Sequence, residues 1–432
     1  MMKTVKIGKG NEGFILSQLN NRKEEDLTVI DNRVKVIIEE VRGKGDEALF
    51  QLTERFDKVK ISHLKVSGEE IEAAFSQVES SFIEIINKAS DNIRSFHKKQ
   101  YEESWRYNKD DNVMLGQLIN PLESVGVYVP GGKAVYPSTV LMNIIPAKIA
   151  KVNRIVMTTP PAQDGSINPY ILVAAKIAGA DEIYKIGGAQ AAAALAYGTE
   201  SIKPVNKIVG PGNIYVARAK KYLYGIVDID MIAGPSEVCI VADEQADAVY
   251  AAADLLSQAE HDEMAASILI TTSEAFADAV KIEVQKQLAE LSRVDIATES
   301  IKNNGLICLV DDIESAFSVS NYIAPEHLEI MLDEPMEYIP FIKNAGAVFL
   351  GKYSPEPLGD YFAGPNHTLP TGGTAAFASP LGVYDFVKRS SLIYYSKEAL
   401  EKEKDYIINF AEKEGLTAHG NSIRVRFNQK GE

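Results

Sequence analysis

The sequence predicts an α/β protein with two parallel sheets, a helical N-terminal region and a small C-terminal tail. From Ser124 onward, short β-branched runs alternate with Ala-rich helical stretches. Apolar strands that alternate with helices are typical of parallel sheets covered on both faces. The alternation continues for too long to fit one compact layer, so two such sheets are expected.

The N-terminal hundred residues are predicted to be mostly helical. Residues 1–22 are short and polar, and we interpret them as an arm. From Val34 to Val41, apolar side chains recur with helical spacing, and Asp46 follows two glycines as a helix cap. A longer amphipathic pattern then runs from Ile71 to Phe96.

The remaining elements follow in order along the chain. The strand-like runs are SVGVYV, RIVMTT, EIYKI, NKIVG, EVCIVAD, SILITT, LICLV and AVFLG. The helical stretches between them include TVLMNIIPAKIA, YILVAAKIAGA, AQAAAALAYG and QADAVYAAADLLSQAEHDE. After about Leu381 the strand pattern stops, and a charged helix from Ser396 to Asn409 leads into the tail.

Composition and charge narrow the class of protein. A chain of 432 residues is long enough for about two to four domains. The net charge of −15 disfavours nucleic acid as a partner, because an acidic surface repels phosphates. The two cysteines, Cys239 and Cys308, lie in apolar runs and make no disulfide framework. With no signal-peptide pattern and no long apolar run, we expect a cytoplasmic protein without a membrane span.

Four glycine clusters follow strand-like runs, at residues 126–139, 186–191, 208–213 and 232–237. Glycine there lets backbone N–H groups approach a phosphate, and a following helix offers its positive end. No complete G-x-G-x-x-G is present, so each cluster alone is equally compatible with a tight strand-to-helix turn. Four clusters close together favour a nucleotide site at the ends of the strands.

Four of the six histidines stand beside groups that suit metal binding and acid–base chemistry. Gln258 and His261 are three residues apart on a predicted helix and share a face. His327 follows Glu326 after a proline, where we expect a loop. The other two lie in Gly- and Pro-rich or C-terminal segments, as Asp360 with His367 and as Glu414 with His419. Each motif alone is compatible with ordinary surface residues, but together they match a mixed N/O coordination sphere.

These motifs resemble those of the histidinol dehydrogenase family, in the family's order, from about Ile30 to Arg426. The matching segments are VGVYVPGGKAVYPSTVLMN, KIVGPGNIYVARAK, DMIAGPSEV, LLSQAEHD, NYIAPEHLEI, LGDYFAGPNHTLPTGGTAAF and EGLTAHGNSIRVR. The resemblance implies two incomplete Rossmann-like domains. It divides the chain into an arm (1–22), a discontinuous first domain (23–127 and 238–377), a second domain (128–237) and a tail domain (378–432).

The resemblance also implies the reaction. The family oxidises L-histidinol to L-histidine with two NAD⁺, through an aldehyde that stays bound, in the last step of histidine biosynthesis. It implies one Zn²⁺ per subunit, which anchors the imidazole and amine of the substrate as a template.

The family's site residues carry over as follows. The implied zinc ligands are Gln258, His261, Asp360 and His419, which also contact substrate. The catalytic residues are Glu326, which activates water, and His327, the general base; both contact substrate. Further substrate contacts fall on Ser236, His367 and Glu414, and NAD contacts fall on Tyr128, Gln190 and Asn213.

The tail adds an expectation about assembly. Glu414 and His419 follow a helical linker, far along the chain from the other predicted ligands. Members of the family are homodimers with shared sites, so His419 is expected to serve the zinc of the partner subunit.

Two alternatives stay open at this point. In the first, an enzyme with this fold oxidises a different amino or sulfonated alcohol, although every residue suited to an imidazole and an amine is present. A zinc hydrolase or a non-catalytic binding protein would keep the metal and Glu326 but would need no nicotinamide.

Overall fold

The computed structural model describes residues 2–19, 27–131 and 135–427. The chain forms two compact units, of which the first comprises Met1–Gln100 and Leu122–Phe386. The second comprises Tyr101–Pro121 and Val387–Glu432. Parts of the predicted arm and of the first glycine cluster lie outside the described residues.

A five-stranded parallel sheet lies in the first unit, with the order β6-β5-β4-β7-β8. Its strands are β4 (Ser124–Tyr128), β5 (Arg154–Thr158), β6 (Glu182–Tyr184), β7 (Lys207–Val209) and β8 (Asp228–Ile229). Its helices are α5 (Pro137–Ile149), α6 (Pro169–Ala178), α7 (Gly188–Tyr197) and α8 (Ile214–Leu223). The chain builds outward from β4 to β6 and then returns to place β7 on the other side of β4. This reversal creates a topological switch point at the carboxyl ends of β4 and β7.

Four N-terminal helices pack against the helices that cover the five-stranded sheet. They are α1 (Thr28–Lys44), α2 (Asp46–Asp57), α3 (Gly68–Phe75) and α4 (Ser80–His97). Helix α1 packs against α7 and α8, whereas α4 packs against α5 and α6. Val34 and Leu49 share one apolar core with Val156 and Tyr184. The helical prediction is therefore confirmed, but these helices join the sheet of the predicted second domain, whereas the sequence grouped residues 23–127 with 238–377.

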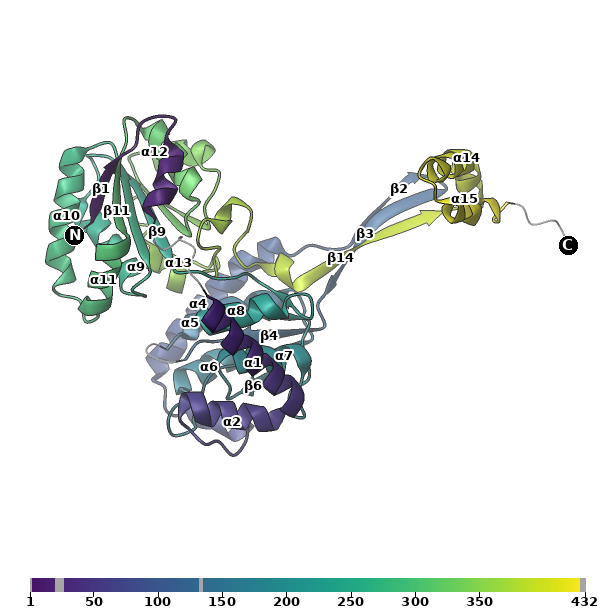
Figure 1. The fold of residues 1–432 in the computed structure, drawn as a ribbon, viewed down its shortest axis with the longest axis horizontal. Coiled ribbons are helices and arrows are strands. Elements are labelled where there is room, and N and C mark those ends of the chain that lie inside the picture. The colour runs from purple at the N-terminus through teal and green to yellow at the C-terminus, as the bar shows by residue number, and fades with distance from the viewer. Residues whose placement is uncertain (1, 20–26, 132–134, 428–432) are drawn as a thin grey trace. The chain divides into compact units, whose positions relative to one another are not determined.

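A six-stranded parallel sheet has the order β1-β11-β10-β9-β12-β13. Its strands are β1 (Lys3–Lys6), β9 (Glu237–Ala242), β10 (Ala266–Thr271), β11 (Gly305–Leu309), β12 (His327–Met331) and β13 (Ala347–Leu350). Helices on its faces are α9 (Ala248–Ala259), α10 (Glu274–Leu288), α11 (Val294–Asn304) and α12 (Ile313–Ile323). Figure 1 shows α9, α10 and α11 on one face and α12 on the other. The N-terminal residues that we interpreted as an arm supply the edge strand β1, which pairs with β11.

The first unit also contains one short α-helix and several 3₁₀ helices. Helix α13 (Glu356–Tyr361) lies near the end of the first unit. The 3₁₀ helices are η1 (Glu12–Gln18), η3 (Lys98–Gln100), η4 (Pro335–Phe341), η5 (Thr374–Ala376) and η6 (Val383–Phe386).

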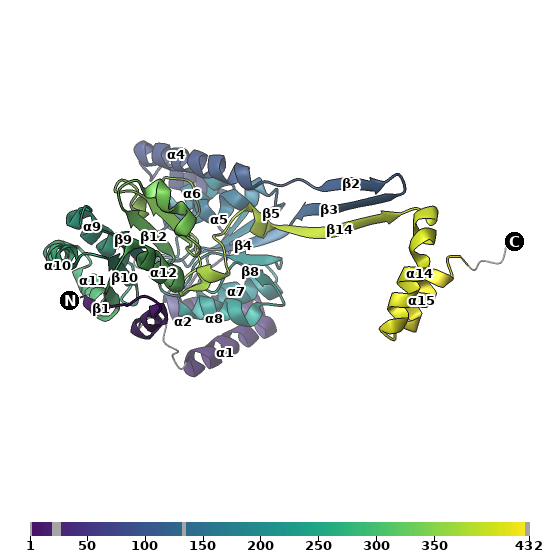
Figure 2. The same ribbon diagram turned by 90° about the horizontal axis from the view of Figure 1, so that it is seen from above.

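The second unit is a three-stranded antiparallel ribbon with two helices. The strands β2 (Trp105–Asp110), β3 (Val113–Pro121) and β14 (Val387–Tyr395) are ordered β14-β3-β2. Helices α14 (Lys397–Lys413) and α15 (Thr417–Arg424) follow β14 and pack on each other (Figure 2). The expectation that strands stop after Leu381 is wrong. Strand β14 is mostly exposed and lacks a buried apolar run, and its pairing partner β3 is remote in sequence.

These observations confirm the predicted fold class: two parallel-sheet layers with a helical N-terminal region and a small C-terminal region. As limits of independently folding domains, the predicted boundaries stay a prediction. Among the described residues, no helix is both long and apolar enough to cross a bilayer. The cytoplasmic location stays a prediction.

Candidate functional site

The switch point of the five-stranded sheet is lined by tightly approaching glycines and by Tyr128, the last residue of β4. Gly210 follows β7 with a φ of 108°, and a Cβ there would collide with the carbonyl oxygen of Tyr128. The Tyr128 hydroxyl accepts the N–H of Gly188 at 3.2 Å. A Cβ on Gly212 would lie 3.1 Å from the Tyr128 ring. We call Tyr128, Gly188, Gly210 and Gly212 the glycine edge.

Two of the predicted NAD residues flank the glycine edge on helix N-termini. Asn213 caps α8, and its Oδ1 accepts the N–H groups of Tyr215 and Val216. Gln190 is buried in the first turn of α7, beside Gly188. Burial raises the pKa of Tyr128 to about 12, so its hydroxyl stays protonated and able to donate. Two helix N-termini beside side-chain-free backbone can hold the phosphates of a dinucleotide.

The predicted catalytic residues lie at the amino edge of the six-stranded sheet. Glu326 directly precedes β12, and His327 is its first residue, paired in register with Val238 of β9. The sequence predicts a loop for both residues. Glu326 does lie in a bend, whereas His327 is the first residue of a central strand, because the backbone enters the parallel ladder at that position.

The backbone of Glu237 holds both predicted catalytic side chains. Its N–H donates to Glu326 Oε2 at 2.9 Å, and its carbonyl oxygen lies 3.1 Å from His327 Nδ1. A carbonyl oxygen can only accept, so Nδ1 carries the proton and Nε2 keeps a free lone pair. We call Glu326 and His327 the acid–base pair.

Burial shifts the pKa values of the acid–base pair in opposite directions. Desolvation lowers the pKa of His327 to about 4, against the effect of its hydrogen bond to Glu237. His327 is therefore neutral near pH 7 and can accept a proton at Nε2. Burial raises the pKa of Glu326 well above its usual range, and the nearby acids Glu237, Asp360 and Glu356 add to the shift.

A cluster of possible metal ligands lies in the first unit. One ligand atom from each of His261, Glu356 and Asp360 lies within 4.8 Å of the others. Asp360 and Glu356 are one turn apart on α13, and His261 lies just beyond the end of α9. We call these three residues the ligand cluster.

Gln258, the fourth residue of this region, has an unused acceptor. It lies in the last turn of α9, is buried, and its Oε1 has no hydrogen-bond partner in the described part of the chain. A buried amide oxygen without a donor is costly, and coordination of a cation would satisfy it. The donor set of one imidazole, one amide oxygen and carboxylates suits Zn²⁺ or a similar divalent ion.

The sequence motifs do not identify Glu356 as a candidate ligand. Burial raises the pKa of Glu356 to about 8, and the neighbouring Asp360 adds to this shift. Its helical spacing of four residues from Asp360 is visible in SPEPLGDYF, but the prolines suggested a loop. The segment instead forms α13, with Pro357 in its first turn, where a missing N–H costs nothing.

The predicted substrate residues of the first unit lie around these groups. His367 Nδ1 is 3.1 Å from the carbonyl oxygen of Asp360, so it donates there and leaves Nε2 as an acceptor. Burial lowers the pKa of His367 to about 4. Ser236 directly precedes Glu237, whose backbone holds the acid–base pair. Glu414 and His419 belong to the second unit, where both are exposed, His419 on α15.

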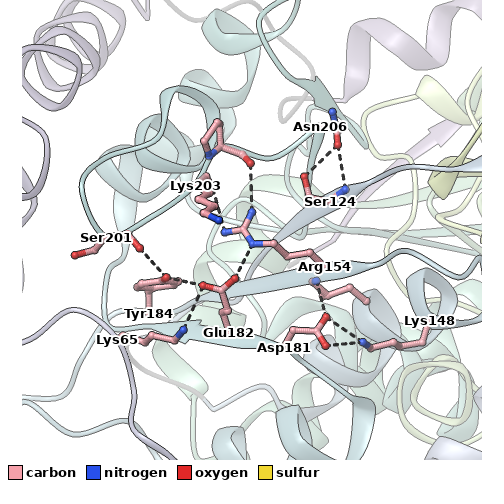
Figure 3. A network of polar contacts seen from close by, with 12 residues as sticks. Lys65, Ser124, Lys148, Arg154, Asp181, Glu182, Tyr184, Ser201, Lys203 and Asn206 are labelled. Carbon is pink, nitrogen blue, oxygen red and sulfur yellow. Dashed lines mark hydrogen bonds and ion pairs between the residues drawn. The ribbon is translucent and has the colours of Figure 1, made fainter.

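A separate cavity of about 550 Å³ lies at the amino ends of β5 and β6. Figure 3 shows that its charged groups satisfy one another: Arg154 donates to Glu182 at 2.6 Å and to two backbone carbonyls. Lys148 pairs with Asp181, and the Tyr184 hydroxyl donates to Glu182. We interpret this network as structural, since its main cation and acids are already paired.

Comparison with known proteins gives one consistent result. The family model described as histidinol dehydrogenase matches residues 20–427. A histidinol dehydrogenase of Clostridium acetobutylicum is 55% identical over 95% of both chains. One of Listeria monocytogenes is 54% identical over 99% of this chain and 100% of its own. The crystal structure of histidinol dehydrogenase from Elizabethkingia anophelis superposes with a TM-score of 0.93 at 39% identity, covering 98% of each chain.

The ligand cluster leads to a first prediction. His261 is the only residue of the ligand cluster that offers a nitrogen ligand. Replacing it with Ala should therefore lower the affinity for Zn²⁺ by at least about 10-fold. Competition with a chromogenic chelator measures this affinity. His63→Ala, which removes an exposed histidine outside the cluster, should bind Zn²⁺ as the wild type does. Equal affinity in wild type and His261→Ala would contradict the assignment.

Proposed function

Because the chain belongs to the histidinol dehydrogenase family, we propose that it oxidises L-histidinol to L-histidine in two NAD-dependent steps through bound L-histidinal. Membership makes the protein an oxidoreductase of histidine biosynthesis that acts on histidinol. The four-electron course, the cofactors and the residue roles are the proposal. The observation that carries it is the Glu237 backbone, which holds a neutral His327 and a carboxyl side by side.

In the first oxidation His327 is the general base. Its Nε2 accepts the hydroxyl proton of histidinol while the carbon gives a hydride to the nicotinamide of NAD⁺, which leaves the aldehyde and NADH. A lowered pKa keeps His327 neutral at the working pH, and its Nδ1–H bond to Glu237 fixes the tautomer. Tyr128, Gln190 and Asn213 are proposed to hold NAD at the glycine edge.

In the second oxidation Glu326 activates water. Its carboxylate removes a proton from water as the oxygen adds to the aldehyde carbon, and the protonated His327 returns its proton to the aldehyde oxygen, which gives the hydrate and neutral His327. His327 then accepts a hydrate proton, and a second hydride passes to a second NAD⁺. The balance is one histidinol, one water and two NAD⁺, giving histidine carboxylate, two NADH and three protons.

A metal fits beside the acid–base pair. We propose that one Zn²⁺ is held by Gln258, His261 and Asp360 of one subunit and by His419 of the partner subunit. Glu356 lies beside these ligands. When bound, the ion supplies a positive template that fixes the imidazole and amine of the substrate. The unpartnered Gln258 Oε1 and the ligand cluster support this assignment. Ser236, His367 and Glu414 are proposed to complete the substrate contacts.

A covalent thiol route is disfavoured. Cys239 and Cys308 are both buried on central strands of the six-stranded sheet. Burial raises the pKa of the Cys308 thiol far above neutral, so it does not supply a thiolate nucleophile. The aldehyde is therefore proposed to react with water and not with cysteine.

We also propose a homodimer with shared active sites, in which His419 serves the partner's zinc. The second unit supports this, because its large apolar side chains are largely uncovered in a single chain. Tyr406 is 78% exposed and Phe410 is 69% exposed on α14, while Trp105 and Tyr394 are about half exposed on the ribbon. Exposed aromatic side chains are enriched at subunit interfaces.

The reaction itself is tested by its stoichiometry. With NAD⁺ and L-histidinol, absorbance at 340 nm should rise, and about two NADH should form per histidinol consumed, as expected for two hydride transfers. A hydrolase or a non-catalytic binding protein would produce no NADH. A ratio near one would mean that the aldehyde, and not histidine, is the product.

The pH dependence tests the role of Glu326. Its raised pKa means that kcat should fall as pH decreases through that pKa, because only the carboxylate activates water. Glu326→Gln keeps an acceptor for the Glu237 N–H but cannot ionise. We expect it to lower kcat by about 10²–10⁴-fold and to lose this acidic limb. A variant whose acidic limb is unchanged would assign the limb to another group.

Mixed dimers test the shared site. His327→Ala and His419→Ala should each lower activity by about 10²-fold or more, since a base or a ligand is lost. In a hybrid of the two, one site combines intact His327 from one chain with intact His419 from the other. Each hybrid should then regain about half of the wild-type activity. If purified hybrids are no more active than their parents, His419 does not act across the dimer.

A further inference from the structure

Strand β12 carries a second buried acid that the proposed mechanism does not use. Glu329 follows His327 by two residues, so the two side chains leave the strand on the same face. Leu328 and Ile330 point to the other face, into an apolar core. Glu329 is only 1% exposed. A carboxyl buried in the middle of a sheet is costly, so its partners need a physical reason.

Glu329 contacts two other elements. Its Oε1 accepts the backbone N–H of Glu356 at 2.7 Å, where α13 begins. The other oxygen of Glu329, Oε2, is buried and accepts no hydrogen bond from an N–H or hydroxyl group among the described residues. The carboxyl of Asp254, on α9, lies within hydrogen-bonding reach of Glu329, and two carboxyl groups bond each other when one of them keeps its proton. We call Asp254 and Glu329 the carboxyl pair.

The carboxyl pair connects the three elements that carry the site. Strand β12 begins with His327, α13 carries Glu356 and Asp360, and Asp254 stands one turn before Gln258 on α9. The Ser257 hydroxyl makes a parallel link, since it lies 3.1 Å from Glu356 Oε2 and 2.8 Å from the Asp254 carbonyl oxygen. These contacts connect α9 and α13 to each other and to the strand that begins with His327.

Stability alone does not explain the carboxyl pair. Replacing a buried polar pair with apolar groups of similar shape is often neutral or stabilising. Apolar residues of α9 and Met331 of β12 already form one core next to it, so a leucine at position 329 would have apolar neighbours. The specific consequence of the pair is the orientation of α9 and α13 relative to β12.

We propose that Asp254 and Glu329 are positioning residues that hold α9 and α13 against β12, so that Gln258, His261 and Asp360 converge on one divalent cation beside His327. This rests on the proposed metal assignment and deepens it. The pair acts through the residues that carry the ligands and touches neither substrate nor cofactor. Partners of this kind typically change metal affinity by about 10–100-fold when they are removed.

The test compares matched variants of the full-length enzyme. Glu329→Leu keeps a similar volume and removes both bonds, so the dissociation constant for Zn²⁺, measured by chelator competition, should rise about 10–100-fold. Glu329→Gln should remain within about threefold of wild type, because its amide oxygen still accepts from Glu356 and its NH₂ still donates to Asp254. If Glu329→Leu does not fold, Asp254→Ala and Asp254→Asn repeat the comparison from the partly exposed helix.

A further control distinguishes the positioning of the metal ligands from the general packing of α9 on the sheet. Ser267 of β10 donates to the carbonyl oxygen of Leu255 at 2.6 Å, one residue from Asp254. Ser267→Ala also removes a buried hydrogen bond between α9 and the sheet, but this bond does not involve α13. The affinity of this variant for Zn²⁺ should therefore stay at the wild-type value. Thermal unfolding of every variant, measured with Zn²⁺ removed, reports stability independently of the metal.

Three results would overturn the proposal: unchanged Zn²⁺ affinity in Glu329→Leu, an equal loss in Glu329→Gln, or an equal loss in Ser267→Ala. Failure of the proposed function looks different. Wild-type protein would then bind no Zn²⁺, or bind it just as well after His261→Ala. The positioning role is supported if Zn²⁺ binds weakly to Glu329→Leu and Asp254→Ala but with nearly wild-type affinity to Glu329→Gln and Asp254→Asn.

Discussion

The parallel pairing of β9 with β12 is the constraint on which the proposed active centre depends. It aligns His327 with Val238, and this places the peptide groups of Glu237 within reach of two side chains at once. The N–H group orients Glu326 and the carbonyl group orients His327. Backbone atoms have no rotamers to lose, so this arrangement keeps a base and a carboxyl in fixed positions at small entropic cost. A change in strand register by one residue would separate the pair.

The two parallel sheets have the same winding but different uses. In each sheet, three strands build outward and the fourth returns to the other side of the first, giving switch points at β4/β7 and at β9/β12. The five-stranded sheet has its glycine edge at the carboxyl ends of its strands, as expected for a nucleotide site. The six-stranded sheet instead carries the acid–base pair at the amino ends of β9 and β12. The same strand order therefore positions both the proposed NAD site and the proposed acid–base pair.

Burial dominates the electrostatics of the site. Desolvation is the largest cause of the pKa shifts of Glu326, His327, Glu356 and Asp360. It keeps the histidine neutral and makes the carboxylates strong bases. Among the described residues, no lysine or arginine contributes to the pKa shifts of these four groups, and a site that concentrates several acids in this way is suited to a cation, whether a metal ion or a protonated amine. The carboxyl pair of Asp254 and Glu329 extends this acidic region outward to the elements that support it.

The sequence by itself determined the fold class and the family, because hydrophobic periodicity and glycine spacing are local properties of the chain. It also identified Gln258, His261 and Asp360, which the structure brings to one region, and Glu326 with His327, of which only His327 lies on a strand. Only the tertiary structure revealed the backbone clamp of Glu237, the addition of Glu356 to the ligand cluster and the carboxyl pair. The Glu237 contacts join residues 89 and 90 positions apart, the bond from Glu356 to Glu329 joins residues 27 positions apart, and Glu356 is 95 positions from His261. A linear pattern has no signal for such contacts, since they arise when strands pair and helices pack.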